Sequence, residues 1–194
     1  MGYAKGLPLA LTILGSDLYD SDMQQWKSAL ESYKEIPNPD IQETLKISYN
    51  RLDDRAKKIF LDIACFFIGV DVDHVITILD NCHFYIKKLI DKCLISIEFK
   101  RLRMHDLLRD MGREVVRQES DEPGERSRLW FHEDIRHVLE DNTGTNKVEG
   151  IVIELPKPDL IHLSSKVFKK MTRLRLFINR NACFLKDLIF CLMS

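Results

Sequence analysis

The feature that most limits the fold is an apolar run in the first half of the chain, residues 57–69, KKIFLDIACFFIG. Ile59, Ile63 and Phe67 recur at helical spacing, and further apolar side chains lie on the opposite side of the same helix. A helix of this kind is buried on most of its faces, so other elements must cover it. Gly69 follows the run and is expected to end the helix.

Helical patterns lie before and after this run, and a change of period follows them. Near residues 94–104 the apolar residues alternate around the polar tip EFKR, which is typical of a short β-hairpin. Helices followed by a hairpin give the order of a winged-helix domain. Other helices are expected over residues 7–18, from a cap at Asp20, Ser21 or Asp22 to about 33, and over 39–49, 73–80, 85–92, 104–117 and 131–140. A strand is expected over 148–155, and a further helix is expected to begin at Ser165.

The 194 residues suffice for one ordinary domain or two small ones, and 45% hydrophobic with 30% charged residues allows a core and a solvated surface. No apolar run is long enough for a transmembrane helix, and the N-terminal MGYAKGLPLALTILG lacks the basic region of a signal peptide. The formal net charge of −1 shows none of the basic excess of a protein that binds phosphate backbones.

The five cysteines are odd in number and form no C-x-x-C pair. This argues against a disulfide framework or a zinc knuckle and favours free thiols in a reducing cytosol. Cys65 and Cys93 lie in apolar stretches, where we expect both to be buried.

No motif in the chain points to catalysis. HEDIRH, residues 132–137, places its second histidine five residues after the first, about 140° round a helix, so both rings cannot bind one zinc ion. The sequence has no G-x-S-x-G, no cysteine with an activating neighbour and no P-loop motif G-x-x-x-x-G-K-[ST]. We therefore expect no enzyme, and no unaided binding of Mg²⁺ and a phosphate chain.

Met104, His105 and Asp106 stand at the head of the strongly patterned segment LRMHDLLRDMGREVV. Its apolar positions are Met104, Leu107, Leu108, Met111 and Val115, which share one side of a helix. His105 falls on the border of this stripe. Taken from these residues alone, His105 is best explained as a capping or half-buried structural histidine.

Four motifs in a fixed order resemble the plant disease-resistance proteins of the TIR–NB-ARC–leucine-rich-repeat class. They are GLPLAL (6–11), the run 45–69 that contains the sequence FLDIACFF, RMHDLLRDMGREVVRQES (103–120) and the segment 125–151. The resemblance covers about residues 3–178. It implies a mainly α fold in which a helical subdomain precedes a winged-helix domain with a short β-hairpin, followed by a linker and the start of a leucine-rich repeat.

The resemblance also implies domain boundaries. Residues 1–36 would be the C-terminal part of the NB-ARC helical subdomain, and 37–120 the winged-helix subdomain with its MHD motif. Residues 121–147 would be a linker, 148–180 the start of the repeats, and 181–194 a divergent or truncated tail. MTRLRLFIN, 171–179, matches the repeat pattern only once, and one repeat cannot bury its own face.

For the site, the resemblance implies a nucleotide switch. Pro8 would lie against the adenine, His105 would contact the β-phosphate of ADP in the resting state, and Asp106 would brace the histidine's surroundings. ADP or ATP would bind in the complete receptor only, since the chain starts just before GLPL and no tight binding to this part alone is expected. The partners would be the P-loop and TIR portions and the repeats, without a membrane, in the cytoplasm or alternatively the nucleus.

Two other functions stay open at this point. A winged helix can bind nucleic acid, but the charges between residues 104 and 118 cancel, three against three, which makes this unlike a DNA-binding helix. A steep dependence of DNA affinity on salt would identify that function. The third alternative is a non-functional truncated fragment.

Overall fold

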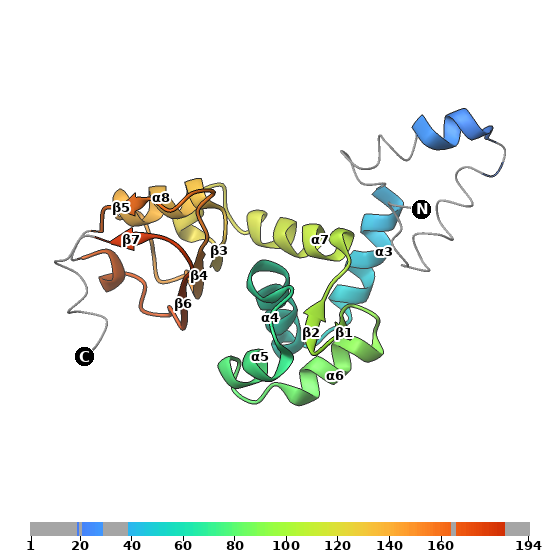
Figure 1. The fold of residues 1–194 in the computed structure, drawn as a ribbon, viewed down its shortest axis with the longest axis horizontal. Helices are drawn as coiled ribbons and strands as arrows, with labels where there is room; N and C mark the ends of the chain where they lie inside the picture. The colour runs from blue at the N-terminus through green and yellow to red at the C-terminus, as the bar shows by residue number, and fades with distance from the viewer. Residues whose placement is uncertain (1–18, 20, 29–38, 164–165, 185–194) are drawn as a thin grey trace. The chain divides into compact units, whose positions relative to one another are not determined.

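The computed structural model describes residues 19, 21–28, 39–163 and 166–184 (Figure 1). Its internal contacts divide it into two units. The first unit comprises the described residues of Met1–Phe60 and Ile68–Met111, and the second those of Leu61–Phe67 and Gly112–Ser194. The GLPL motif, and with it Pro8, lies outside the described residues. The domain boundaries expected from the sequence stay a prediction.

From residue 39 onward, the first unit has the helices and hairpin that the sequence predicts, whereas the helix predicted over 7–18 lies outside the described residues. The carboxylate of Asp53 accepts a hydrogen bond from the Ala56 N–H at 2.9 Å and so caps α4, and Asp71 caps α5 in the same way. The elements are α3 (Pro39–Asn50), α4 (Asp54–Asp62), α5 (Val72–Ile78), α6 (His83–Asp91), β1 (Ser96–Glu98) and β2 (Arg101–Arg103).

A third extended segment completes the wing. β1 and β2 pair antiparallel, with Ile97 opposite Leu102. On the other side of β2, the Gly69 N–H donates to the Leu102 carbonyl at 2.8 Å, and the Leu102 N–H donates to Val70 at 2.9 Å. Gly69 has a φ of +80°, a conformation that glycine adopts without strain, and this lets the chain turn from the helix into the wing. The winged-helix order expected from the sequence is confirmed.

The apolar run supplies the core, although its helix is not uniform. Phe60 is fully buried, and its ring lies 5.4 Å from that of Tyr49. After Asp62 the α-helix widens into a π-helix, Ile63–Phe67, in which all five residues are buried. The sequence predicts one continuous helix here. Over five residues the two helix types bury nearly the same set, so apolar spacing does not distinguish them.

The second unit contains the later elements and two parallel sheets, ordered β3-β4-β6 and β5-β7. The predicted strand over 148–155 and helix over 131–140 are confirmed as β4 and α8. The elements after the wing are α7 (Asp106–Arg117), η2 (Pro123–Glu125), β3 (Arg128–Leu129), α8 (His132–Glu140), β4 (Gly150–Ile153), β5 (Leu160–Ile161), η3 (Val167–Lys169), β6 (Leu176–Asn179) and β7 (Cys183–Phe184).

The helix expected from Ser165 onward is wrong in kind. Val167–Lys169 forms one 3-10 turn, closed by the Lys169 N–H on the Lys166 carbonyl at 3.0 Å. The chain must become extended again before β6, and the few residues available leave room for only one tight turn.

Parallel pairing of β4 with β6 explains how the single repeat motif buries its apolar face. Ile151 pairs with Phe177, 26 positions later, which is the spacing of successive coils in a leucine-rich repeat. Helix α8 covers the same core. The buried members are Leu129, Ile135, Val138, Leu139, Val148, Ile151, Ile153, Leu155, Ile161, Val167, Met171 and Ala182. The preceding strand β4 and the helix α8 therefore cover the apolar face of this coil, as neighbouring repeats do in a longer array.

The polar segment that follows α7 is well bonded. The Ser127 N–H and hydroxyl donate to the Glu119 carboxylate at 2.6 and 2.8 Å, and Arg126 reaches the Asp134 carboxylate at 2.9 Å. A Cβ at Gly124 would lie 2.3 Å from the Thr143 carbonyl oxygen, so only glycine fits at this close contact.

Within the described part of the chain, no helix is long and apolar enough to span a membrane.

The burial of Phe60 leads to a test with a built-in control. Phe60→Ala removes a fully buried ring and should lower the free energy of unfolding by about 3–5 kcal/mol. Phe99→Ala changes a side chain that is 95% exposed and should change it by less than about 0.5 kcal/mol. Denaturant unfolding of both variants measures the difference, and equal losses would show that the ring of Phe60 is not in the core.

Candidate functional site

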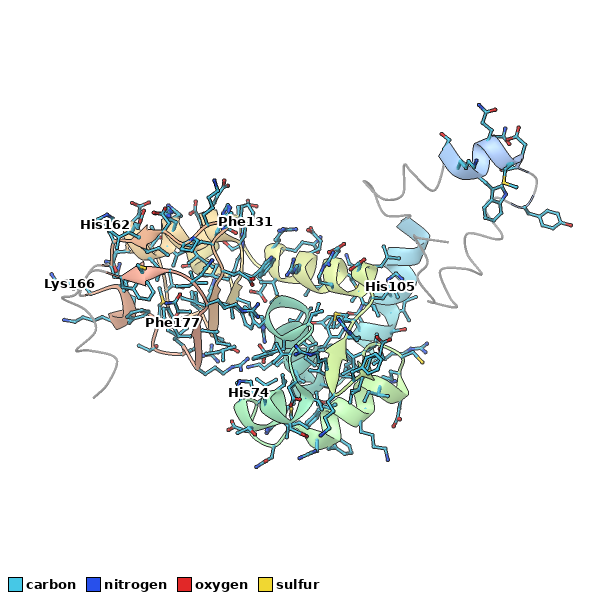
Figure 2. All side chains as sticks on the ribbon, viewed as in Figure 1. His74, His105, Phe131, His162, Lys166 and Phe177 are labelled. Carbon is cyan, nitrogen blue, oxygen red and sulfur yellow. The ribbon has the colours of Figure 1, made fainter. Side chains whose placement is uncertain are left out.

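His105 immediately precedes helix α7, which begins at Asp106. Its Nδ1 accepts a hydrogen bond from the Leu107 N–H at 3.2 Å, and its carbonyl accepts from the N–H groups of Leu108 and Arg109, both at 3.0 Å. The side chain is half-buried. Figure 2 labels His105 at the start of α7. His105 therefore fills the place that serine or asparagine commonly occupies as a helix N-cap.

This cap decides which ring nitrogen carries the proton. A nitrogen that accepts a hydrogen bond from an N–H group has no proton of its own, so in the neutral imidazole the proton is on Nε2. Nε2 is then a hydrogen-bond donor. A ring N–H of this kind can donate to an acceptor such as a phosphate oxygen.

Asp106 is the first residue of α7, where the helix dipole favours an acidic side chain. Its Oδ1 accepts a hydrogen bond from Nη1 of Arg109 at 2.9 Å, as the spacing of these charges predicts. Arg109 also donates to the Asp110 carboxylate at 2.8 Å. Because the Arg109 N–H is bonded to the His105 carbonyl, the Asp106–Arg109 pair closes the first turn of the helix around His105.

The apolar stripe of α7 is confirmed at Leu107, Leu108 and Met111, which are buried. Near the end of the helix the prediction is wrong by one residue: Val116 is fully buried, whereas Val115 is partly exposed. The reason is a change of neighbours, since the last turns of α7 belong to the second unit.

In those turns two guanidinium groups lie over one indole ring. The Arg113 and Arg117 guanidinium carbons are 5.5 and 5.6 Å from the centre of the Trp130 ring, within cation–π distance. Helix α7 is thus capped by His105 and ends in contact with the segment that leads into α8.

The metal and nucleophile candidates have other roles in the structure. His137 Nδ1 lies 2.8 Å from the Asp141 carboxylate, and the His132 ring packs on Phe131 with centroids 4.9 Å apart. In the ranges that the structure describes, no three His, Cys, Asp or Glu side chains gather in a way that could hold a metal ion.

Cys65, Cys82, Cys93 and Cys183 are free thiols. Burial raises the pKa of the Cys65 thiol to about 12, against the weaker opposing effect of Arg128 and Arg113. Cys93 is exposed, so the expectation that it is buried is wrong. It lies in the turn between α6 and β1 with a φ of +56°.

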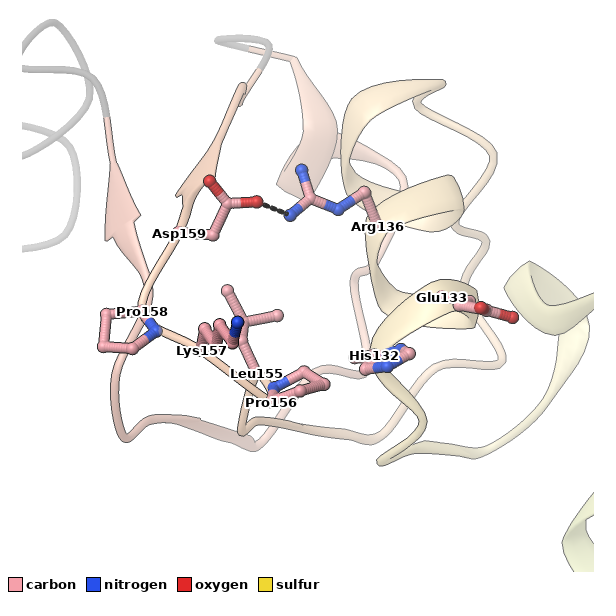
Figure 3. Close-up of a pocket in the computed structure, with 8 residues that line it drawn as sticks. All are labelled: His132, Glu133, Arg136, Leu155, Pro156, Lys157, Pro158 and Asp159. Atoms are coloured by element: carbon pink, nitrogen blue, oxygen red, sulfur yellow. Dashed lines mark hydrogen bonds and ion pairs between the residues drawn. The ribbon is translucent and has the colours of Figure 1, made fainter.

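A pocket of about 490 Å³ lies beside the start of α8 (Figure 3). Its largest cation, Arg136, already donates to the Asp159 carboxylate at 2.6 Å, to Glu140 at 3.1 Å and to the Leu160 carbonyl at 3.1 Å. The pocket is lined by His132, Glu133, Arg136, Leu155, Pro156, Lys157, Pro158 and Asp159. The charges of Arg136 and Asp159 are therefore already paired with each other within the chain.

One charged cluster was not predicted from the sequence. Asp62, in the middle of the apolar run, accepts hydrogen bonds from Arg128 at 2.7 Å and from Arg175 at 2.7 and 2.8 Å. A single acid inside a buried run is itself the signal, since a buried carboxylate needs a cationic partner. The partners, 66 and 113 positions away, cannot be found from spacing.

Comparison with known proteins agrees with the fold and the motifs. Residues 53–120 match the model of the winged-helix domain of Roq1-like disease resistance proteins. The chain carries a Roq1-like winged-helix domain. This match includes α4, the wing and the whole of α7, and therefore both His105 and Asp106.

Several plant proteins named as resistance proteins are similar to most of the chain. It is 45% identical over 181 residues to disease resistance protein RUN1 of Vitis rotundifolia, which covers 91% of the chain and 14% of the relative. It is 43% identical to RPP2B of Arabidopsis thaliana over 89% of the chain and 15% of that protein. TMV resistance protein N of Nicotiana glutinosa is 42% identical over 91% of the chain, which spans 16% of it.

These relatives confirm the resemblance to plant resistance proteins of the TIR–NB-ARC–leucine-rich-repeat class. The chain spans about one seventh of the length of the curated relatives it matches. None of these comparisons tests the roles expected for Pro8, His105 and Asp106, which stay predictions.

The differences between the thiols lead to a labelling test. At about pH 8 iodoacetamide should modify the exposed Cys93 and Cys183 at least tenfold faster than Cys65 in the folded chain. With a pKa of about 12, roughly one Cys65 thiol in ten thousand is ionised at that pH, and the thiolate is the reactive form. Peptide mapping by mass spectrometry reads each site separately. Labelling of Cys65 at the rate of Cys93 would contradict its burial.

Proposed function

We propose that the chain is the regulatory part of an intracellular plant immune receptor, an ADP/ATP-dependent signalling switch in the defence response. The observation that carries the proposal is the His105 cap, which leaves Nε2 as a hydrogen-bond donor at the start of α7. The homology to resistance proteins named from several plants supports the receptor context.

In the proposed resting state, His105 Nε2 donates a hydrogen bond to the β-phosphate of ADP held by a P-loop subdomain. A hydrogen bond to a charged group contributes roughly 1.5–3 kcal/mol. An off state favoured by only a few kcal/mol therefore depends strongly on this one contact. The printed 194 residues contain no P-loop motif, so the phosphates and Mg²⁺ would be bound by another part of the receptor. Pro8 would contribute the contact to the adenine.

Asp106 acts indirectly in this proposal. Its carboxylate is bound by Arg109, and the Arg109 N–H is bound to the His105 carbonyl, so loss of the carboxylate loosens the turn that holds the histidine. The proposed partners are the P-loop and TIR portions of the receptor and its leucine-rich repeats. The proposed place of action is the cytoplasm, with the nucleus as an alternative.

Nucleic-acid binding is less well supported. Around the wing, Arg101 donates to the Gly69 carbonyl at 2.7 Å, and Arg103 lies 3.6 Å from the Glu98 carboxylate. On α6, Lys88 is paired with Asp53. Affinity for a duplex comes mainly from cations that neutralise phosphates. These three cations are engaged within the chain.

Two substitutions at His105 separate a phosphate contact from a helix cap. In a receptor assembled from this chain and a matching P-loop subdomain, His105→Ala removes both the cap and the ring donor. His105→Asn keeps a side-chain acceptor, and asparagine is among the best N-caps, but it lacks the Nε2 donor. Both variants should release ADP about 10- to 150-fold faster, the equivalent of the lost hydrogen bond. Only His105→Ala should also lower the melting temperature.

ADP release is followed by displacement of a fluorescent analogue, and melting by circular dichroism. If His105→Asn keeps both normal ADP release and normal stability, while His105→Ala is merely less stable, His105 is only a helix cap and the proposed switch contact is wrong.

A further inference from the structure

The Asp62 cluster is a buried charge network within the second unit. The side chains of Asp62 and Arg128 are only 2% and 3% exposed, and that of Arg175 is 39% exposed. Both carboxylate oxygens are used: Oδ1 accepts from Arg128 and Arg175, and Oδ2 accepts from Arg175. A carboxylate buried to this extent is stable only while cations remain beside it.

Further polar groups surround the two arginines. Nη1 of Arg128 donates to the Ser127 hydroxyl at 2.8 Å, and that hydroxyl donates to Glu119. Nε of Arg175 lies 3.5 Å from the Glu149 carboxylate. Partial burial acts to lower the pKa of the Arg175 guanidinium, but the Asp62 and Glu149 carboxylates outweigh it, so the pKa is raised and the charge is retained.

Apolar packing and a hydrogen bond from a side chain to a backbone carbonyl also attach residues 62–66 to the strands. A Cβ at Gly150 would lie 2.7 Å from Cε2 of Phe66, so this ring packs directly on the β4 backbone. The Phe66 carbonyl accepts a hydrogen bond from Nη2 of Arg180, just after β6, at 3.2 Å. β3, β4 and the two ends of β6 therefore each have a contact to residues 62–66.

The segment between these contacts is the π-helix Ile63–Phe67. A π-helix has poorer hydrogen-bond geometry than an α-helix and persists where its surroundings hold it. The contacts at Asp62, just before the π-helix, and at Phe66, within it, hold the segment on both sides of Ile63–Cys65.

We propose that the Asp62–Arg128–Arg175 cluster is a conformational latch that holds segment 61–67 on the strands of the second unit. While the three charges are paired, the π-helical segment and the strand ends undergo local opening only together. Loss of the Asp62 charge lets the segment and the strand ends open more often.

Hydrogen exchange of the complete 194-residue chain tests the latch. Asp62→Asn keeps the side-chain shape and removes the charge. The latch predicts at least tenfold faster exchange in residues 62–67 and at the strand amides of Gly150 and Leu176, which are bonded to Ser127 and Glu149. Exchange in α5 should change less than twofold.

The matched control is Asp159→Asn, the same chemical change at a carboxylate that is 62% exposed and bound to Arg136 at 2.6 Å. It should leave residues 62–67 and the strand amides unchanged. If Asp62→Asn does not fold, Arg175→Gln is the milder variant, because Arg128 remains beside Asp62. When both variants fold, adding Arg175→Gln to Asp62→Asn should have little further effect, since the pair acts as a unit.

Two results would overturn the proposal. Unchanged exchange in residues 62–67 and the strand amides would show that the charges do not hold the segment. Equal acceleration throughout the chain, α5 included, would show a general loss of stability rather than a local latch.

Discussion

The burial of one carboxylate, that of Asp62, is the constraint on which the second unit depends. A charge inside an apolar run must be compensated, and only side chains from distant parts of the chain can reach it. Arg128 is part of β3, and Arg175 directly precedes β6. Pairing of both arginines with Asp62 therefore also holds these strands near each other. Residues 61–67 lie within the winged-helix match at 53–120 and are nevertheless part of the second unit. A boundary between winged helix and repeats drawn by sequence order alone would separate Asp62 from both of its partners.

Helix α7 has specific contacts at both of its ends. At its start His105 serves as the cap and is left with its donor on Nε2, while Asp106 and Arg109 close the first turn. At its end Arg113 and Arg117 lie on Trp130, beside the polar segment that β3 follows. The element proposed to sense the nucleotide is thus directly connected in the chain to the element that starts the repeats.

Much of the fold follows from periodicity and caps. The order of helices and wing, the cap at Asp53, the strand β4 and the helix α8 are all predictable, since each has a strong local pattern. The errors occur where tertiary contacts override such patterns: the π-helix after Asp62, the burial of Val116 in place of Val115, the single turn at Val167–Lys169 and the exposed Cys93. The ion cluster could not be predicted, because its members are far apart in sequence. For the site, the residues alone favour a capping His105, which the structure bears out, whereas its phosphate contact and that of Pro8 to adenine rest on the resemblance.

The central claim is that the Asp62 carboxylate is paired with Arg128 in the interior of the folded chain. Side-chain NMR of the ¹⁵N-labelled protein tests it directly, because Arg128 Nε–H is the donor to Asp62 Oδ1 and is shielded from solvent. The account predicts a resolved, slowly exchanging Nε–H signal for Arg128 that shifts and exchanges rapidly in Asp62→Asn. An Arg128 signal that already exchanges as fast as those of exposed arginines in the unaltered chain, or that is unaffected by Asp62→Asn, would contradict it.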